Sequence, residues 1–245
     1  MRTALLTLLA LYLAVVLVVY FRQRSFLYYP SHEPSFTHQL TPWKLGSRVI
    51  GYAREVPQPR TLWLLCHGNA GQAADRAYVL PRLAPTDSLY VLEYPGYGLR
   101  DGSPSRDSMN AAALEAYEHL RHQNPGTPIG VIGESIGSGP ACSLAQAAPP
   151  PDKIVLLTPF DTLAKVAAHH MSFLPARLIL KDDWDNVTAL RDYRGPVEIY
   201  GAIDDNIIPF SHAQALASAH PGAVYRSILG GHNDWSRDST LLIER

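Results

Sequence analysis

The stretch Gly133-Glu134-Ser135-Ile136-Gly137 has a short apolar run before it and a run of small residues after it. Residues 128–132, PIGVI, have the length and composition of a buried strand, and residues 138–148 are suited to a closely packed helix. A strand, a G-x-S-x-G turn and a helix in this order are the context of a nucleophile elbow. The two outer glycines leave room where strand and helix nearly touch, and the serine is held in a strained backbone conformation. We therefore expect the Ser135 hydroxyl to stand above the end of a sheet.

Further apolar runs on both sides of this stretch predict the rest of the sheet. Six runs have the unbroken apolar character of strands covered on both faces: 61–66, 88–94, 128–132, 153–158, 196–200 and 223–229. Helical spacing at 72–83, 107–122 and 211–219 then predicts an α/β fold with a mainly parallel sheet and helices on both faces. Residues 48–54 are a candidate early strand, and the irregular stretch at about 160–190 predicts a small lid insert. Ligands bind such sheets beyond the carboxyl ends of the strands.

The N-terminal residues 4–21 contain no charged side chain. As a helix they would be about 27 Å long, which is close to the hydrocarbon thickness of a bilayer. We interpret residues 1–24 as a single-pass membrane anchor and transmembrane helix, followed by one domain over residues 25–245. A cleaved signal peptide is an alternative, although the run is long and lacks a small-x-small site, and a buried core helix is another. Arginines lie on both sides of the run, so the side of the membrane that the domain occupies stays open.

Composition narrows the class of protein. The length of 245 residues suits one α/β domain or two small ones, with a substantial core. The net charge of −1 gives no reason to expect a nucleic-acid partner. Cys66 and Cys142 both lie in stretches that read as buried, so we expect two free thiols rather than a disulfide, which leaves the redox compartment open.

A serine is a weak nucleophile unless a base takes its proton, so Ser135 requires a histidine and an acid that orients it. His232 follows the last strand in a glycine-rich loop and comes last in the order Ser, Asp, His. The acid is expected after the penultimate strand, where Asp204 and Asp205 are adjacent; the Asp-x-x-Ile-Pro spacing favours Asp205, and Asp204 stays open. The remaining histidines are interpreted as structural or surface residues: His32, His38, His67, His119, His122, His169, His170, His212 and His220.

The oxyanion that forms in acyl transfer needs two N–H donors. Ile136 follows the nucleophile at the start of a helix, where free amides and the helix dipole favour negative charge. The second donor is expected from the loop after residues 61–66, with Asn69 favoured and Ala70 as the alternative. We expect the Glu134 side chain to point away from the serine hydroxyl. A phosphate-binding loop is the competing interpretation, but the chain has neither Gly-Lys-Ser/Thr nor G-x-G-x-x-G at a strand end.

Five motifs occur together and in order: His67-Gly-Asn-Ala-Gly71; Tyr94-Pro-Gly-Tyr-Gly98 with Gly102-Ser-Pro104; Gly133-Glu-Ser-Ile-Gly137; Asp205-Asn-Ile-Ile-Pro209; and Gly231-His-Asn-Asp234. Over about residues 45–240 the chain resembles α/β-hydrolases of the branch related to serine aminopeptidases and prolyl oligopeptidase catalytic domains. It is most similar there to membrane-anchored α/β-hydrolase-domain proteins. The resemblance implies a Ser135–Asp205–His232 triad with an oxyanion hole from Ile136 and Asn69, and we expect no cofactor and no metal.

The chain departs from the family pattern in two places. The segment before Thr61 is short for the usual opening antiparallel strands, which predicts a reduced sheet edge. The usual final helix after the base is cut short at Arg245. Neither departure removes a candidate site residue.

The sequence therefore predicts a membrane-anchored serine hydrolase, like a carboxylesterase or thioesterase, that cleaves an ester or thioester through an acyl-enzyme. The expected substrate is a small-molecule or lipid-like acyl compound, because an anchor and an apolar lid (Phe173 and 178–180) accompany the site. Two alternatives stay open, a serine peptidase resembling aminopeptidases and a catalytically idle hydrolase fold that acts as an interaction module. Asp182, Asp183 and Asp185 are expected to be exposed charges of the lid.

Overall fold

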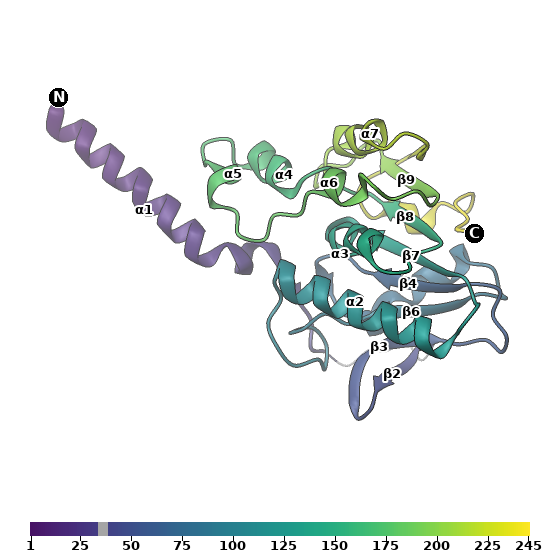
Figure 1. Ribbon diagram of the computed structural model, residues 1–245. Coiled ribbons are helices and arrows are strands. Elements are labelled where there is room, and N and C mark those ends of the chain that lie inside the picture. The colour runs from purple at the N-terminus through teal and green to yellow at the C-terminus, as the bar shows by residue number, and fades with distance from the viewer. Residues whose placement is uncertain (34–38) are drawn as a thin grey trace.

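A computed structural model describes residues 1–33 and 39–245 of the chain, and His38 lies outside the described residues. Within the described residues eight strands form one sheet in the order β10-β9-β8-β7-β4-β6-β3-β2 (Figure 1). Six consecutive strands of this order, from β10 at one edge to β6, are parallel and match the six apolar runs: β4 (Leu62–Cys66), β6 (Ser88–Leu92), β7 (Ile129–Glu134), β8 (Lys153–Leu157), β9 (Val197–Ala202) and β10 (Val224–Ile228). The mainly parallel sheet of an α/β fold is therefore confirmed.

The antiparallel edge of this sheet is more complete than the sequence predicts. β2 (Thr41–Leu45) and β3 (Arg48–Arg54) form a hairpin, and β3 pairs antiparallel with β6. The expectation of a reduced sheet edge is wrong. Four of the five β2 residues are exposed or half-buried, so β2 lacks the apolar run of a central strand, and its one buried side chain, Trp43, packs on Tyr90 with ring centroids 4.9 Å apart.

Helices cover both faces of the sheet. On one face α2 (Arg106–Gln123), α3 (Ser138–Ser143) and α7 (Phe210–Ala219) pack in a common core with alternate residues of β4 and β7. The other face is covered by two 3₁₀ helices, η1 (Ala73–Arg82) and η4 (Asp234–Arg237), with the C-terminal tail. The helix after the serine is shorter than expected, because α3 gives way to a 3₁₀ turn, η3 (Leu144–Gln146), before the prolines at 149–151. Cys66 and Cys142 are free and buried, as predicted.

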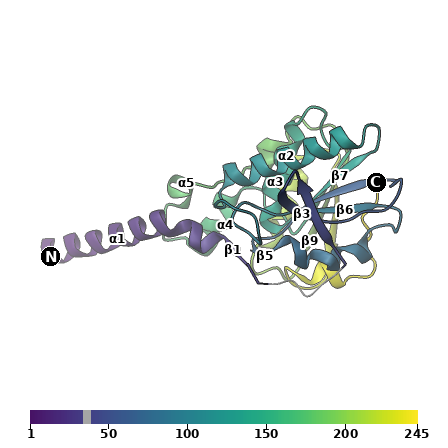
Figure 2. The ribbon, with the colours of Figure 1, turned by 90° about the horizontal axis from the view of Figure 1, so that it is seen from below.

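The N-terminal helix α1 (Arg2–Leu27) projects away from the rest of the chain in both ribbon views (Figures 1 and 2). It is long and apolar enough to cross a membrane, with a mean hydropathy of 2.7 over its most apolar window, and a signal sequence has the same properties. Its last turns contact the stretch at 160–190, hereafter the lid segment, which contains α4 (Leu163–His170), α5 (Ala176–Ile179) and α6 (Asn186–Leu190).

After α1 the chain forms a short strand, β1 (Tyr29–Pro30), that pairs in parallel with β5 (Ala70–Gly71). This two-stranded pair lies outside the main sheet. It connects the end of the N-terminal helix to the loop that follows β4, because β5 is part of that loop.

Candidate active site

The turn at Ser135 has the strained geometry that the G-x-S-x-G pattern requires. Ser135 follows β7, opens the 3₁₀ turn η2 (Ser135–Gly137), and has a positive φ of 55°. A Cβ at Gly133 would lie 2.7 Å from the Cβ of Ala141 on α3, and one at Gly137 would lie 2.0 Å from the Cys66 carbonyl oxygen. Glycine is therefore required on both sides, because β7, β4 and α3 meet there without space for a methyl group.

The structure brings three of the expected side chains into one chain of hydrogen bonds. His232 Nε2 lies 2.8 Å from the Ser135 hydroxyl oxygen, and His232 Nδ1 lies 2.6 Å from Asp205 Oδ2. All three residues are buried, with 7–8% of each exposed. Because the carboxylate can only accept, the proton of the neutral imidazole lies on Nδ1, and Nε2 is left to accept from the serine hydroxyl. This is the arrangement in which an imidazole can act as a general base toward a serine.

The two adjacent acids after β9 lie in different environments. Asp205 is buried, and its Oδ1 accepts the backbone N–H groups of Ile207 (2.9 Å) and Ile208 (2.8 Å), so the carboxylate is fixed with Oδ2 toward His232. Asp204 is exposed, and its backbone N–H donates to the Gly230 carbonyl oxygen at 3.0 Å. Asp205, rather than Asp204, therefore contacts the imidazole.

The two expected oxyanion donors belong to two different segments. Ile136 follows it in η2, and Asn69 belongs to the loop after β4. This loop approaches the serine closely, because a Cβ on Gly68 would lie 3.7 Å from the Ser135 Cβ. Within residues 1–33 and 39–245, neither the Ile136 nor the Asn69 N–H has an acceptor. Ala70, the alternative donor, lies one residue farther along, in β5.

Comparisons with known proteins identify the family. The chain is 31% identical over 239 residues to the uncharacterized protein Rv2307c of Mycobacterium tuberculosis, covering 90% of this chain and 84% of that one. It is 27% identical over 201 residues to the lysophosphatidylserine lipase ABHD12 of Danio rerio, covering 74% of this chain but only about half (52%) of the lipase. The chain belongs to the α/β-hydrolase superfamily. No family model matches it.

Solved structures support the same fold for this α/β-hydrolase. The esterase Pf2001 of Pyrococcus furiosus superimposes with a TM-score of 0.65 at 14% identity, over 84% of this chain and 90% of the esterase. The acylaminoacyl peptidase of Pyrococcus horikoshii gives a TM-score of 0.58 at 11% identity, over 85% of this chain and 40% of the peptidase. At such identities the likeness concerns the fold alone.

In this hydrolase Glu134 has a role that the sequence did not reveal. Its carboxylate accepts the backbone N–H of Gly68 (3.2 Å) and the hydroxyl of Tyr78 (2.9 and 3.0 Å). The side chain thus holds the loop that carries Asn69, and within the described residues the hydroxyl of Ser135 pairs with His232 rather than with Glu134. Burial, with the nearby Glu134 charge, raises the pKa of Tyr78, so this phenol stays protonated and donates.

The ring of His67, at the start of the same loop, is structural. It is fully buried, its Nδ1 lies 2.7 Å from the Gly68 carbonyl oxygen, and it packs on the Tyr94 ring at a centroid distance of 4.4 Å. Burial, with the nearby Arg76 charge, lowers the pKa of His67 and favours the neutral imidazole. The ring therefore supports the loop and does not compete with His232 as a base.

A second acid–histidine pair, which no sequence pattern indicated, lies at the start of the lid segment. Asp161 Oδ1 lies 2.7 Å from His212 Nδ1 on α7, and Asp161 Oδ2 accepts from Lys165. Burial raises the pKa of Asp161, but the hydrogen bonds from His212 and Lys165 outweigh it and lower the pKa to about 2. The pair joins the lid segment to the sheet-covering helix α7. No group of three His, Cys, Asp or Glu residues in the described ranges could hold a metal ion.

The lid segment also corrects two expectations and contains an apolar cavity. Asp183, expected to be exposed, is half-buried and accepts the Ala164 N–H at 2.9 Å, whereas Asp185 is exposed as expected. Asp182, expected to be exposed, is buried at 3% and paired with Arg24 of α1 at 2.8 Å, because α1 covers it. Beside this pair, a cavity of about 160 Å³ lies between the end of α1 and the helices α4 and α5. It is lined by apolar side chains such as Val19, Phe26, Leu27, Val166, Leu174 and Ile179.

Proposed function

We propose that this α/β-hydrolase is a membrane-anchored serine hydrolase that cleaves an ester or thioester of a lipid-like acyl group. The proposal rests above all on the continuous hydrogen bonding from Asp205 through His232 to Ser135. Asp205, His232 and Ser135 follow β9, β10 and β7 in turn, beyond the carboxyl ends of parallel strands, which is where ligands bind such sheets.

In the proposed reaction the Ser135 oxygen attacks the acyl carbonyl carbon while His232 Nε2 takes the hydroxyl proton. The negative charge that develops on the carbonyl oxygen is stabilised by the N–H groups of Ile136 and Asn69. Collapse of this intermediate breaks the ester or thioester bond, and the leaving alcohol or thiol receives the proton from His232. Water then attacks the acyl-enzyme with His232 again as base, which releases the acid and restores Ser135. Asp205 holds the imidazole tautomer and stabilises the imidazolium.

The nature of the acyl group is proposed from the N-terminal helix, from an apolar cavity beside it and from one relative. The exposed apolar helix α1 supports residues 1–24 as the anchor, with residues 25–245 as the hydrolase domain and residues 160–190 as its lid. An apolar cavity of about 160 Å³ between the end of α1 and the lid helices α4 and α5 supports a hydrocarbon ligand, since a cavity of about 150 Å³ in another protein holds a benzene molecule. Similarity to a lysophosphatidylserine lipase supports the same substrate class.

Labelling with a fluorophosphonate probe tests the proposal. Membranes containing the full chain are treated with the probe, with Ser135→Ala as the matched control. We expect labelling of the wild type and none of the variant. Absence of any Ser135-dependent labelling would contradict the enzyme proposal and would support the catalytically idle interaction module instead.

A second comparison tests the substrate class. The wild type is given p-nitrophenyl esters of increasing acyl length and an aminoacyl p-nitroanilide. We expect kcat/KM to rise with acyl length and to be lowest for the anilide. Preferential cleavage of the anilide would indicate a peptidase.

A further inference from the structure

The chain that leaves α1 is hydrogen-bonded to the loop that carries Asn69. The Tyr29 N–H donates to the Asn69 carbonyl oxygen at 3.0 Å, and the Ser31 N–H donates to the Gly71 carbonyl oxygen at 2.9 Å. In the other direction, Asn69 Nδ2 donates to the carbonyl oxygen of Leu27, the last residue of α1, at 3.0 Å. Two segments 42 positions apart in the sequence are thus joined at the residue proposed as an oxyanion donor.

The carbonyl group and the side chain of Asn69 are both used in hydrogen bonds that fix the loop. Its carbonyl oxygen accepts from Tyr29 and also from the Tyr97 hydroxyl at 2.8 Å, and its side chain is held by Leu27. Its backbone N–H, by contrast, has no acceptor within residues 1–33 and 39–245. The contacts therefore hold the side chain and the carbonyl group of the residue whose N–H is left available to a ligand.

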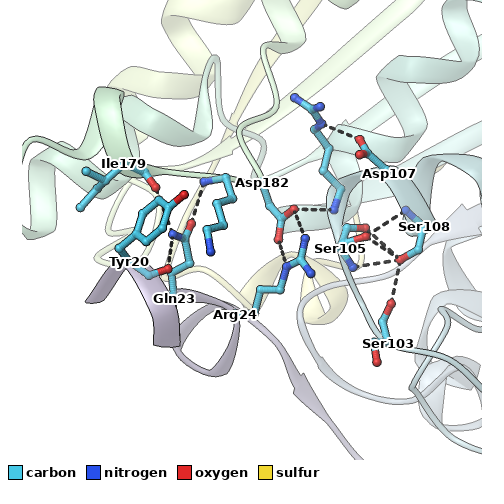
Figure 3. A network of polar contacts seen from close by, with 11 residues as sticks. Tyr20, Gln23, Arg24, Ser103, Ser105, Asp107, Ser108, Ile179 and Asp182 are labelled. Carbon is cyan, nitrogen blue, oxygen red and sulfur yellow. Dashed lines mark hydrogen bonds and ion pairs between the residues drawn. The ribbon is translucent and has the colours of Figure 1, made fainter. Parts of the chain in front are cut away.

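The end of α1 is itself held in place, so it can act as a fixed support. The Gln23 side chain donates to the Ile179 carbonyl oxygen at 3.0 Å and accepts from the Lys181 N–H at 2.7 Å (Figure 3). Next to it, Arg24 makes two hydrogen bonds with the Asp182 carboxylate, at 2.8 and 3.2 Å. A fork of this kind fixes direction as well as distance.

We propose that residues 27–31 are positioning residues for catalysis, because they hold the Asn69 N–H toward the oxyanion. This inference rests on the proposed serine hydrolase function. The loop needs such support since it contains Gly68 and Gly71, the latter with a φ of 86°, and glycines allow the backbone other conformations. Removal of one oxyanion donor lowers kcat by about 10²–10³, so a donor that is less firmly held should lower kcat by a smaller factor. Turnover therefore depends on the segment that directly follows the proposed anchor.

The substitution Tyr29→Pro removes the N–H that donates to Asn69. Tyr28 already has a ψ of 129°, in the range that a residue before proline prefers. Tyr29→Phe is the matched control, because it keeps the N–H. Both variants are prepared as the full chain in detergent micelles, and a second variant, Asn69→Ala, keeps the Asn69 N–H but removes the bond to Leu27.

Two readouts are compared. We expect amide hydrogen exchange of residues 68–71 to be faster in Tyr29→Pro than in Tyr29→Phe. We also expect kcat on a p-nitrophenyl ester to fall about 10-fold or more for Tyr29→Pro and Asn69→Ala, with KM and the pH profile unchanged, because the base and the acyl site are untouched. Affinity for a boronic acid that forms a tetrahedral adduct should fall by the same factor as kcat, which a mere loss of folded protein would not produce.

The outcomes separate the two proposals. Unchanged exchange in Tyr29→Pro overturns the support of the loop, and faster exchange with a wild-type kcat overturns its role in turnover. If the wild type shows no Ser135-dependent fluorophosphonate labelling, the proposed function fails, while the exchange comparison still decides whether residues 27–31 order the loop.

Discussion

At the scale of single residues, the site depends on which of two adjacent carboxylates reaches His232. Asp205 is buried and accepts two backbone N–H groups in addition to the imidazole, whereas Asp204 is exposed. The sequence favoured Asp205 through the Asp-x-x-Ile-Pro spacing but left Asp204 open. The spacing works because Oδ1 of Asp205 accepts from Ile207 and Ile208, which leaves Oδ2 directed at the histidine.

Separate substitution of the two acids checks this assignment. Asp205→Asn should lower kcat by about 10⁴, because the amide cannot hold the reactive imidazole tautomer, while Asp204→Asn should change kcat by less than about threefold. Both are measured by steady-state hydrolysis of a p-nitrophenyl ester. A large loss confined to Asp204→Asn would show that the assignment is wrong.

Asp161 makes the stability of the fold depend on pH in the acid range. Its pKa is lowered to about 2 in the folded chain, against an ordinary 3.8. Because the pKa of Asp161 is lower in the folded than in the unfolded chain, its ionised carboxylate stabilises the fold at any pH above the unfolded pKa. This stabilisation is lost as the pH falls from about 4 to 2. Asp161→Asn should therefore reduce the free energy of unfolding at pH 7 by about 2 kcal/mol and should flatten its dependence on pH in that window.

Urea unfolding of the wild type and Asp161→Asn between pH 7 and pH 2 measures this effect. Asp192→Asn, at an exposed aspartate, serves as the control. Parallel pH profiles for the wild type and Asp161→Asn would contradict the expected contribution.

At the scale of elements, the parallel strands were predictable and the edge was not. A strand such as β4 is buried on both faces and all five of its residues are apolar, so the run is visible in the sequence. The strand β2 has one buried position in five and contains Pro42, which an edge strand tolerates. Its place in the sheet depends on pairing with β3, and such pairing leaves little trace in a short segment.

The contact between α1 and the lid segment is another element-scale feature that sequence patterns could not reveal. Gln23 lies 156 positions from Ile179, and the bond between them depends on how a helix packs on distant turns. Gln23→Leu removes the two hydrogen bonds to the lid segment, and one to Tyr20 within α1, and leaves the Ile179 carbonyl and the Lys181 N–H unpaired. We expect the lid segment to open more often in this variant.

Limited trypsin digestion measures this opening through cleavage after Arg177, an exposed residue of α5. Gln23→Leu should be cut several-fold faster than the wild type. Arg22→Gln is the matched control, because Arg22 is the preceding exposed residue of α1 and its side chain makes no hydrogen bond in the described residues. Equal rates for both variants would argue against the lid contact.

At the scale of the whole molecule, the topology gathers residues that are far apart in the sequence. The carboxyl ends of parallel strands share one edge of the sheet, so Ser135, Asp205 and His232 could be expected to meet once the strands were recognised. The positions of Glu134, Tyr97 and Leu27 around the Asn69 loop could not, because each depends on side-chain packing between separate segments.

Whether α1 anchors the chain in a membrane is tested with the full-length protein. If α1 spans a bilayer, the full chain stays in the membrane pellet after extraction with alkaline carbonate. Lysines at two exposed positions of α1, Leu9→Lys with Leu13→Lys, should release it, since each costs about 2.5–3.5 kcal/mol near the middle of a spanning helix. Release of the intact wild-type chain would contradict a spanning helix, and a mature chain shortened at its N-terminus would indicate a signal peptide.

The two cysteines have a practical consequence. Burial raises the pKa of the Cys66 thiol to about 12, and Cys142, a residue of α3, is also fully buried. Only a thiolate reacts with an alkylating reagent, so neither sulfur is reactive while the chain is folded. Each alkylated thiol then marks a molecule whose core has unfolded. The rate of alkylation under native conditions therefore measures the frequency of global unfolding without any attached dye.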